Sequence, residues 1–270
     1  VSDQLVAPLV ITASQPVQIA SGGAGFRSFN APSLVIESQI SGAGPLRIMG
    51  GSAPGEAARD VRLAHTANSF VGNVVVGDAQ TYGASVLGIT ADGSLGASGN
   101  TVTLGARFFD GESNRSARGG LRAWAHLSLG AGRVVQLDGV GGDSSAGGWI
   151  DTNGFTIAIQ GGIGELAAGN ELLKTGAGTL VLNGHNTFTG LTRVQEGVLG
   201  GHGSVAQVLV SGDAALAPGE SAGLFSVTGD LRLDGGQLRI ELGGLQRGTV
   251  FDALDVGGDI TLDGGALLTL

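Results

Sequence analysis

Short apolar runs recur along the whole chain, each with Val, Ile, Leu or Thr in near alternation and each ending at Gly, Asp or Asn. This alternation, closed by a turn residue, is typical of half-buried β-strands. We expect strands within 33–38, 73–78, 101–106, 133–139, 155–161, 178–184, 191–197, 206–212, 224–229, 231–236, 238–244, 253–258, 260–265 and 267–270. Helical periodicity is nearly absent, and only Pro54 to His65 could form one or two helical turns. The pattern predicts an all-β protein.

The chain also resembles itself at long range. Residues 63–76 match residues 181–194, which places Asn68 on Asn186 and Phe70 on Phe188, and upstream Ile40 matches Ile163. A tandem repeat of short strands indicates a solenoid, because the strands of a sandwich need distinct long-range partners. We therefore predict a right-handed parallel β-helix (β-solenoid) of about 20 to 30 residues per coil, with short loops and one longer excursion.

The same match suggests how the chain is organised. We expect a single continuous β-helix over residues 1–270, made of two diverged repeats (about 10–104 and 134–205), a connecting Arg-rich segment at 105–133 and C-terminal coils at 206–270. The paired asparagines and phenylalanines are expected at turn and core-stack positions that hold the register of the coils. Both ends of such a solenoid are open edges.

Composition agrees with this fold and narrows the function. The 52 glycines suit sharp corners that need positive φ, and the 42% hydrophobic content argues against disorder. A net charge of −9 argues against a nucleic-acid partner, and the absence of cysteine excludes disulfides and thiolate sites. No apolar run approaches a membrane span, so we expect no direct membrane insertion. The start does not resemble a signal peptide, and the chain ends within an expected strand, so we expect it to be a piece of a longer protein.

One stretch, LLKTGAGTLVLNGHNTFTGLTRVQEGVLGG from Leu172 to Gly201, carries a family resemblance. It resembles the passenger-associated β-strand repeat of bacterial autotransporters. The patterned positions are Lys174, Gly176, Gly178, Thr179, Leu180, Leu182, Gly184, Asn186, Thr187, Phe188, Gly190, Thr192, Val194, Gly197 and Leu199. The segment from Ala215 onward is similar to the leucine-rich strands that commonly follow this repeat in passengers.

The resemblance implies a secreted bacterial surface protein, and hence an extracellular location. We expect a non-enzymatic β-helical stalk or adhesin segment without a cofactor, whose partner is a host or matrix surface component. Two alternatives remain open. The chain could instead bind further copies of itself as a subunit of a filament or sheath, or it could be a carbohydrate-active β-helix enzyme.

The segment from Gly105 to Arg133 differs in composition from the rest of the chain. It holds five of the thirteen arginines and several aromatic residues: Arg107, Arg115, Arg118, Arg122, Arg133, Phe108, Phe109 and Trp124. Its plain interpretation is an excursion from the solenoid. Because arginine and aromatic residues are favoured at interface hot spots, we also predict a partner or assembly contact at Arg107, Arg115, Arg118, Arg122 and Trp124.

Candidate catalytic and metal-binding motifs are weak. GESAG, from Gly219 to Gly223, fits a nucleophile elbow with Ser221, but that motif needs a following helix and a later histidine, whereas a strand is expected next and the last histidine is His202. The four histidines are widely spaced, and the Asp-Gly-Gly turns lack the tandem repeat of calcium-binding β-rolls. The acids are scattered, unlike the clustered acids of a glycan-cleaving site. We predict neither a catalytic nor a metal site.

Overall fold

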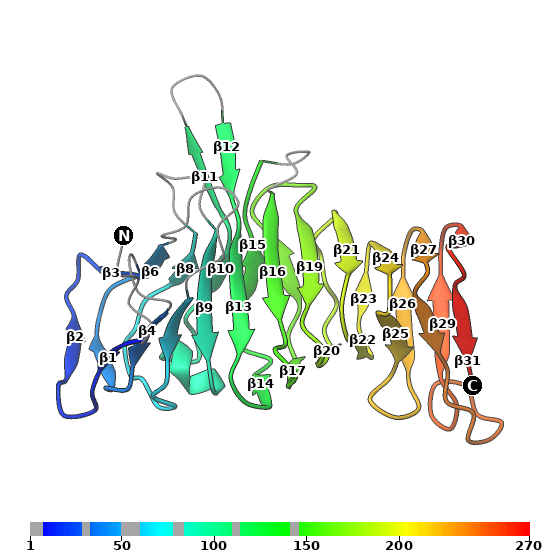
Figure 1. The fold of residues 1–270 in the computed structure, drawn as a ribbon, viewed down its shortest axis with the longest axis horizontal. Helices are drawn as coiled ribbons and strands as arrows, with labels where there is room; N and C mark the ends of the chain where they lie inside the picture. The colour runs from blue at the N-terminus through cyan, green and yellow to red at the C-terminus, as the bar shows by residue number, and fades with distance from the viewer. Residues whose placement is uncertain (1–7, 29–32, 50–59, 78–83, 110–113, 141–145) are drawn as a thin grey trace, which may run out of the picture.

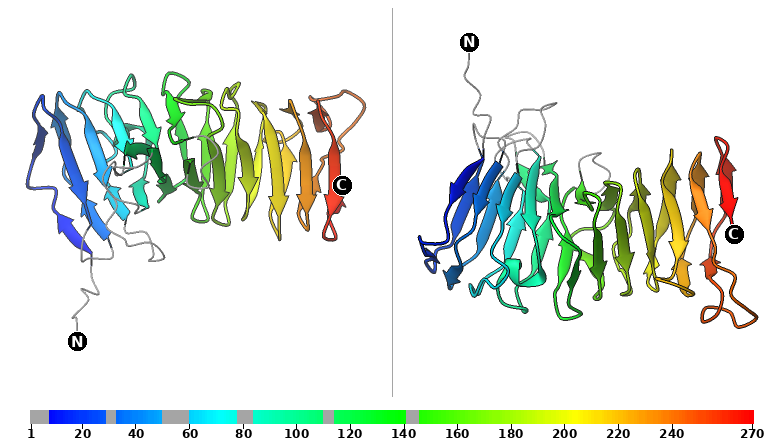
Figure 2. Two further views of the ribbon diagram at one scale, coloured as in Figure 1. Left: turned by 90° about the horizontal axis from the view of Figure 1, so that it is seen from above. Right: turned by 60° about the horizontal axis from the view of Figure 1, so that its bottom comes forward.

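The protein is an elongated stack of coils, in which the chain runs from one end of the molecule to the other (Figure 1). The computed structural model describes residues 8–28, 33–49, 60–77, 84–109, 114–140 and 146–270, with only the backbone at 108, 109, 114 and 115. Strands of successive coils pair in parallel, and the views of Figure 2 show them side by side along the long axis. The predicted parallel β-helix is confirmed.

One sheet of eleven parallel strands runs the length of the molecule, and we call it the long sheet. Its strands are β1 (Leu9–Ile11), β4 (Ser33–Ile36), β7 (Asp60–Leu63), β9 (Ser85–Ile89), β13 (Gly119–Ala123), β16 (Gly147–Asp151), β19 (Glu171–Thr175), β21 (Leu191–Val194), β24 (Gln207–Ser211), β27 (Leu231–Asp234) and β30 (Ile260–Asp263). Each coil contributes one strand to this sheet, so the long sheet records the register of the whole stack.

The second side of the coils changes along the stack. It begins with β2 (Val17–Ile19) and β5 (Ile40–Gly42). In a later coil the 3-10 helix η1 (Asp92–Leu95) takes this place, between β9 of the long sheet and the strand Val102–Leu104 of the third side. It continues as a seven-stranded sheet of β14 (Leu127–Leu129), β17 (Thr156–Ile159), β20 (Thr179–Leu182), β22 (Val198–Gly201), β25 (Ala215–Pro218), β28 (Gln237–Arg239) and β31 (Leu267–Thr269).

The third side consists of two separate sheets. Six strands come first: β3 (Ala24–Arg27), β6 (Leu46–Met49), β8 (Val74–Val76), β10 (Val102–Leu104), β15 (Val135–Leu137) and β18 (Ile163–Glu165). Three follow: β23 (Ser204–Val205), β26 (Leu224–Val227) and β29 (Ala253–Val256). The strand segments expected from the sequence each contain or overlap a strand, although the one at 238–244 holds only the last two residues of β28. The end of the proposed helical segment is wrong, because Asp60–Leu63 is β7. Residues 54–59 of that segment lie outside the described residues.

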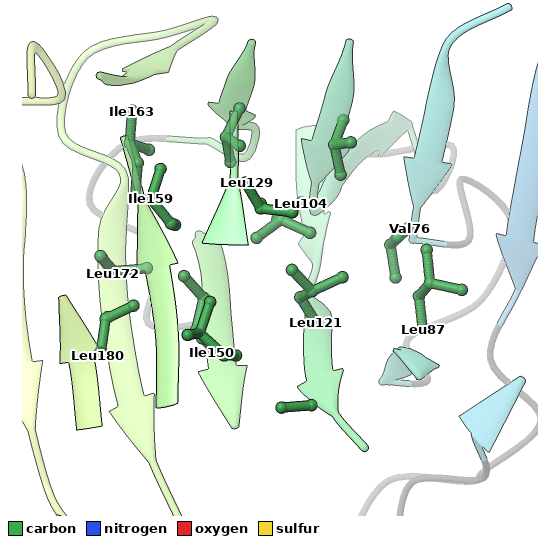
Figure 3. Close-up of a cluster of buried hydrophobic side chains, with 14 of the residues drawn as sticks. Val76, Leu87, Leu104, Leu121, Leu129, Ile150, Ile159, Ile163, Leu172 and Leu180 are labelled. Atoms are coloured by element: carbon green, nitrogen blue, oxygen red, sulfur yellow. The ribbon is translucent and has the colours of Figure 1, made fainter. Parts of the chain in front are cut away.

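Inward-facing aliphatic side chains fill the space between the sides (Figure 3). Residues alternate between the two faces of a strand, so a parallel register stacks like positions of successive coils into ladders. The length of the coils varies more than expected: Val194 pairs with Val210, 16 residues further on, whereas Leu87 pairs with Leu121, 34 residues further on. The ladders tolerate this variation because the extra residues lie in the connections.

The longest coil contains the predicted excursion. It is an antiparallel hairpin of β11 (Ala106–Phe109) and β12 (Asn114–Ala117), which projects from the stack in Figure 1. Immediately after it, β13 returns to the long sheet and pairs with β9. An excursion at this place in the sequence is confirmed.

Candidate functional site

The Arg-rich segment does not form one continuous cluster of free cations. In the described residues its arginines lie against acids of other coils, as N···O contacts of Arg107 with Asp138 (2.7 Å), Arg118 with Glu171 (3.8 Å), and Arg122 with Asp151 (2.7 Å) and Asp60 (3.5 Å). Burial raises the pKa of Asp60 and of Asp138, and in each case the adjacent guanidinium partly offsets that rise. The side chain of Arg115 lies outside the described residues.

Of the five predicted contact residues, Arg122 lies in β13 of the long sheet and Trp124 directly follows that strand. The guanidinium of Arg62 lies over the Trp124 ring, 4.4 Å from its centroid, as in a cation–π pair. The indole Nε1 is buried without a hydrogen-bond partner. Arg107 is carried away from this pair by the hairpin and meets Asp138, which directly follows β15 on the third side. A partner contact at these residues stays a prediction.

Arg133, at the end of the Arg-rich segment, is an interior residue. It is 2% exposed, and its Nε and Nη2 donate to the two carboxylate oxygens of Asp92 at 2.8 and 3.1 Å. Its remaining donors reach backbone carbonyls of the connection after η1, including those of Ala97 at 2.8 Å and Gly96 at 3.2 Å. The guanidinium therefore fastens the turn around η1 and is not available to a partner.

Lys174, the single lysine, stands inside the core. It belongs to a row of the long sheet whose other members are apolar: Leu34, Val61, Leu87, Leu121, Ile150, Val194, Val210, Leu233 and Leu262. Its Nζ donates to Thr152 Oγ1 (2.9 Å) and to the carbonyls of Thr175 (2.8 Å), Gly176 (2.6 Å) and Glu196 (2.9 Å). These acceptors come from three successive coils, so one ammonium ties three coils together at their corner.

The surroundings of Lys174 explain why glycines follow it in the sequence. Gly176 has φ +76°, which favours glycine, and a Cβ on Gly178 would collide with the carbonyl oxygen of Phe155 in the preceding coil. Burial lowers the pKa of Lys174 to about 8, while the carboxylates of Asp151 and Glu196 act in the opposite direction.

Two asparagines make the same inter-coil clamp. Asn68 Oδ1 accepts the N–H of Ile40 at 2.8 Å, and its Nδ2 donates to the carbonyl of Ser94 at 2.8 Å. Asn186 Oδ1 accepts the N–H of Ile163 at 2.8 Å, and its Nδ2 donates to the carbonyl of Ser204 at 2.9 Å. Each amide therefore joins the coil before it to the coil after it.

The clamp explains the long-range sequence match, and Phe70 and Phe188 beside it are buried, as expected of core-stack positions. The strands that follow the clamps differ, because β8 lies on the third side and β21 in the long sheet. What the two matched stretches share is the clamp and its neighbouring phenylalanine. The boundaries of the two predicted repeats stay a prediction.

A shallow groove with a volume of about 490 Å³ crosses the outer face of the second side. Its floor is made of small outward residues of β17, β20, β22 and β25, such as Ala158, Val181 and Gly200, and Arg239 of β28 lies at one end. Strands are about 4.8 Å apart, so the groove extends over roughly 20 Å along the stack. Nothing in the strand pattern of the sequence indicated it.

Two acids beside this groove accept hydrogen bonds from within the protein. The carboxylate of Asp252 accepts the N–H groups of Gly223 and Glu241 at 2.9 and 2.7 Å, and Glu220 Oε1 accepts from Asn183 Nδ2 at 2.7 Å. Within the described ranges no group of three or more His, Cys, Asp or Glu residues could hold a metal ion. The GESAG turn leads into strand β26, so the helix that a nucleophile elbow requires does not follow it.

In the part of the chain that the structure describes, no helix is long and apolar enough to cross a membrane.

Comparison with known proteins gives one family. Residues 172–200 match the passenger-associated-transport-repeat, a stretch that contains Lys174, Asn186 and Phe188. Neither the search of curated proteins nor that of solved structures gives a match. With this repeat set in a parallel β-solenoid, the chain fits the passenger domain of an autotransporter.

Proposed function

We propose that the chain is a non-enzymatic stalk and adhesin segment of a passenger at the bacterial cell surface. The repeat family implies secretion to the cell surface. A stalk must keep its shape between the cell and the target, which requires a backbone ladder without interruption. The observation that carries the proposal is the eleven-stranded long sheet, with buried polar side chains that each tie neighbouring coils together.

The proposed partner is a host or matrix surface component that meets side chains on the outside of the coils. The test couples the whole chain to beads through one terminus and measures bead retention under flow on host cells and on matrix-coated surfaces. Retention above that of beads coupled to an unrelated protein of similar charge is expected. Equal retention of the two kinds of bead would contradict the proposed adhesin function. Release of new reducing ends from polysaccharides by the purified chain would contradict its non-enzymatic nature.

Self-association is a second candidate, favoured by the apolar residues of the last two strands. Ile260 and Leu262 of β30 and Leu267 and Leu268 of β31 are each more than half exposed. Exposed edge strands with apolar side chains pair readily with another chain. Analytical ultracentrifugation and negative-stain microscopy of the chain, and of a Leu262→Glu/Leu268→Glu variant, test this. A monomer without fibres at high concentration rejects the candidate, whereas fibres that the variant lacks support it.

The predicted contact at the Arg-rich segment is tested in the same assays. Arg115, Arg118 and Arg122 are replaced together by serine. If the segment is a contact, bead retention or fibre yield falls. If both bead retention and fibre yield are unchanged, the segment is not a contact.

A further inference from the structure

The two tryptophans of the chain lie on the outside of the long sheet, each over a glycine of the preceding coil. A Cβ on Gly120 would collide with the ring atoms Cε2, Cδ2 and Nε1 of Trp149, and one on Gly88 would lie 2.6 Å from Nε1 of Trp124. Both indoles are half-buried. The glycines therefore leave room for each indole to lie against the sheet.

The two rings differ in what covers them. Arg62 stacks on Trp124, with its Cζ 4.4 Å from the ring centroid, so a face of that ring is occupied. Among the described residues, no aromatic ring or guanidinium stacks on Trp149. Trp149 pairs in register with Leu173, which extends the apolar platform to the next coil.

Charged side chains frame this platform in balanced pairs. Arg122 Nε lies 2.7 Å from Asp151 Oδ2, and Asp151 follows Trp149 by two residues on the same face of β16. On the next coils, Arg193 Nη2 lies 3.7 Å from Glu171 Oε1, and Arg193 pairs in register with Leu173. Arg118 also lies 3.8 Å from Glu171, and Asp60 lies 3.5 Å from Arg122, so the six side chains carry three positive and three negative charges.

This arrangement fits one class of ligand. The electron-rich face of an indole attracts the polarised C–H groups of a sugar ring, and fixed arginine and carboxylate groups donate to and accept from its hydroxyls. Because the frame has no net charge and the whole chain carries −9, nothing here favours an anionic glycan. We propose that the outer face around Trp149 binds a neutral glycan. The proposal deepens the adhesin function and rests on it.

The test uses tryptophan fluorescence, because the chain has only two tryptophans. Trp124→Phe leaves Trp149 as the single reporter, and the variant is titrated with neutral oligosaccharides of glucose, galactose, mannose and N-acetylglucosamine. Heparin and polygalacturonate form the anionic arm. We expect a saturable change in emission with at least one neutral oligosaccharide and a Kd on the order of 1 mM or tighter. Absence of any change, or a change with the anionic glycans alone, overturns the proposal.

Variants of the whole chain locate the site. Glycan affinity, measured by calorimetry, should fall at least tenfold in Trp149→Ala and recover partly in Trp149→Phe, while Arg232→Ala, at an exposed outer position of β27, is the control and keeps its affinity. Equal affinity of Trp149→Ala and the unaltered chain overturns the site. Circular dichroism and the Tm establish that each variant is folded. If Trp149→Ala does not fold, Arg193→Ala and Glu171→Gln test the charged frame instead. The same tenfold loss of glycan affinity is expected in them.

The bead assay separates this proposal from the adhesin function. If beads carrying Trp149→Ala are retained as well as those with the unaltered chain, the adhesin function stands and the glycan platform falls. If neither kind of bead is retained above the control protein, the adhesin function itself falls.

Discussion

Lys174 is a charged residue in a row that is otherwise apolar, between Ile150 and Val194. A buried ammonium is tolerated only where acceptors replace its water, and here a hydroxyl and three carbonyls do so. The acceptors lie at the corner of the coils, where Thr152 Oγ1 also donates to the carbonyls of Thr175 and Gly176. The ammonium therefore donates to the acceptors at the corner, while the aliphatic part of the side chain fills the core.

Replacing Lys174 by alanine should lower the free energy of unfolding by about 3 kcal/mol or more, because the change leaves a cavity and removes the buried hydrogen bonds that join three coils. Lys174→Met keeps most of the stem volume and should cost clearly less. Urea unfolding followed by circular dichroism measures both. Gln195→Ala, at an exposed position one residue after β21, is the control and should change stability by less than about 0.5 kcal/mol. Equal stability of Lys174→Ala and the unaltered chain would contradict the clamp.

The same lysine predicts an unusual pH dependence. Its pKa is about 8 in the folded chain and near 10.5 when unfolded, so between these values only the unfolded chain keeps the proton. The free energy of unfolding should therefore be flat near pH 7 to 8 and rise by roughly 3 kcal/mol toward pH 10.5. The chain has no cysteine and one tyrosine, so few other groups titrate there. Lys174→Met should abolish the rise, and a rise of equal size in that variant would refute the assignment.

Asn186 makes a testable clamp of another kind. Asn186→Ala removes bonds to two neighbouring coils and leaves the buried N–H of Ile163 without its acceptor. We expect a loss of about 2 kcal/mol in unfolding free energy. Thr187→Ala, at the exposed neighbouring position, is the control. Thermal or urea unfolding measures the stability of both variants. Equal losses of unfolding free energy in the two would show that the clamp contributes nothing to stability.

At the scale of elements, the hairpin β11–β12 should be dispensable for the fold. Ala106 and Ala117 face each other across it, so an Asn-Gly turn can replace residues 107–116. The pairing of β9 with β13 then persists, and we expect an unchanged circular dichroism spectrum with a destabilisation of about 1 kcal/mol, because Val140 loses its bond to Ser116. Collapse of the β spectrum would mean that the hairpin is part of the solenoid.

The alternation of apolar residues was enough to predict strands such as β17 and β21, where one face is buried and the other half-exposed. Strands with glycine on their outer face, such as β9 and β13, escaped the pattern, because there the coil offers space to an indole and little alternation remains. Family resemblance marked Lys174, but its charge gives no hint that it points inward. That placement depends on corner carbonyls contributed by neighbouring coils.

In the Arg-rich segment, arginines that are close in sequence lie at separate places in the structure. A coil turns the chain through three sides within about 20 to 30 residues, so Arg107, Arg122 and Arg133 meet acids at different places on the solenoid. The groove of the second side was equally hidden. It runs across several coils, and no contiguous stretch of sequence encodes it.

At the scale of the whole molecule, the long sheet joins successive coils into one continuous body. Each coil contacts its neighbours above and below, so stability in a solenoid is a sum of nearest-neighbour terms. Lys174, Asn186 and Asn68 each bond to coils on both sides of their own. Such clamps should make neighbouring coils rigid with respect to each other, as a stalk requires.

The central claim is therefore that the coils form one rigid stalk, and a distance between two distant coils tests it most directly. The chain has no cysteine, so Val35→Cys in β4 and Asp234→Cys in β27 place two spin labels on the outside of the long sheet. The two strands are eight strand spacings apart, about 38 Å. Double electron–electron resonance should give a single narrow distance distribution near that value, widened only by the labels. A broad or multi-peaked distribution would contradict the account.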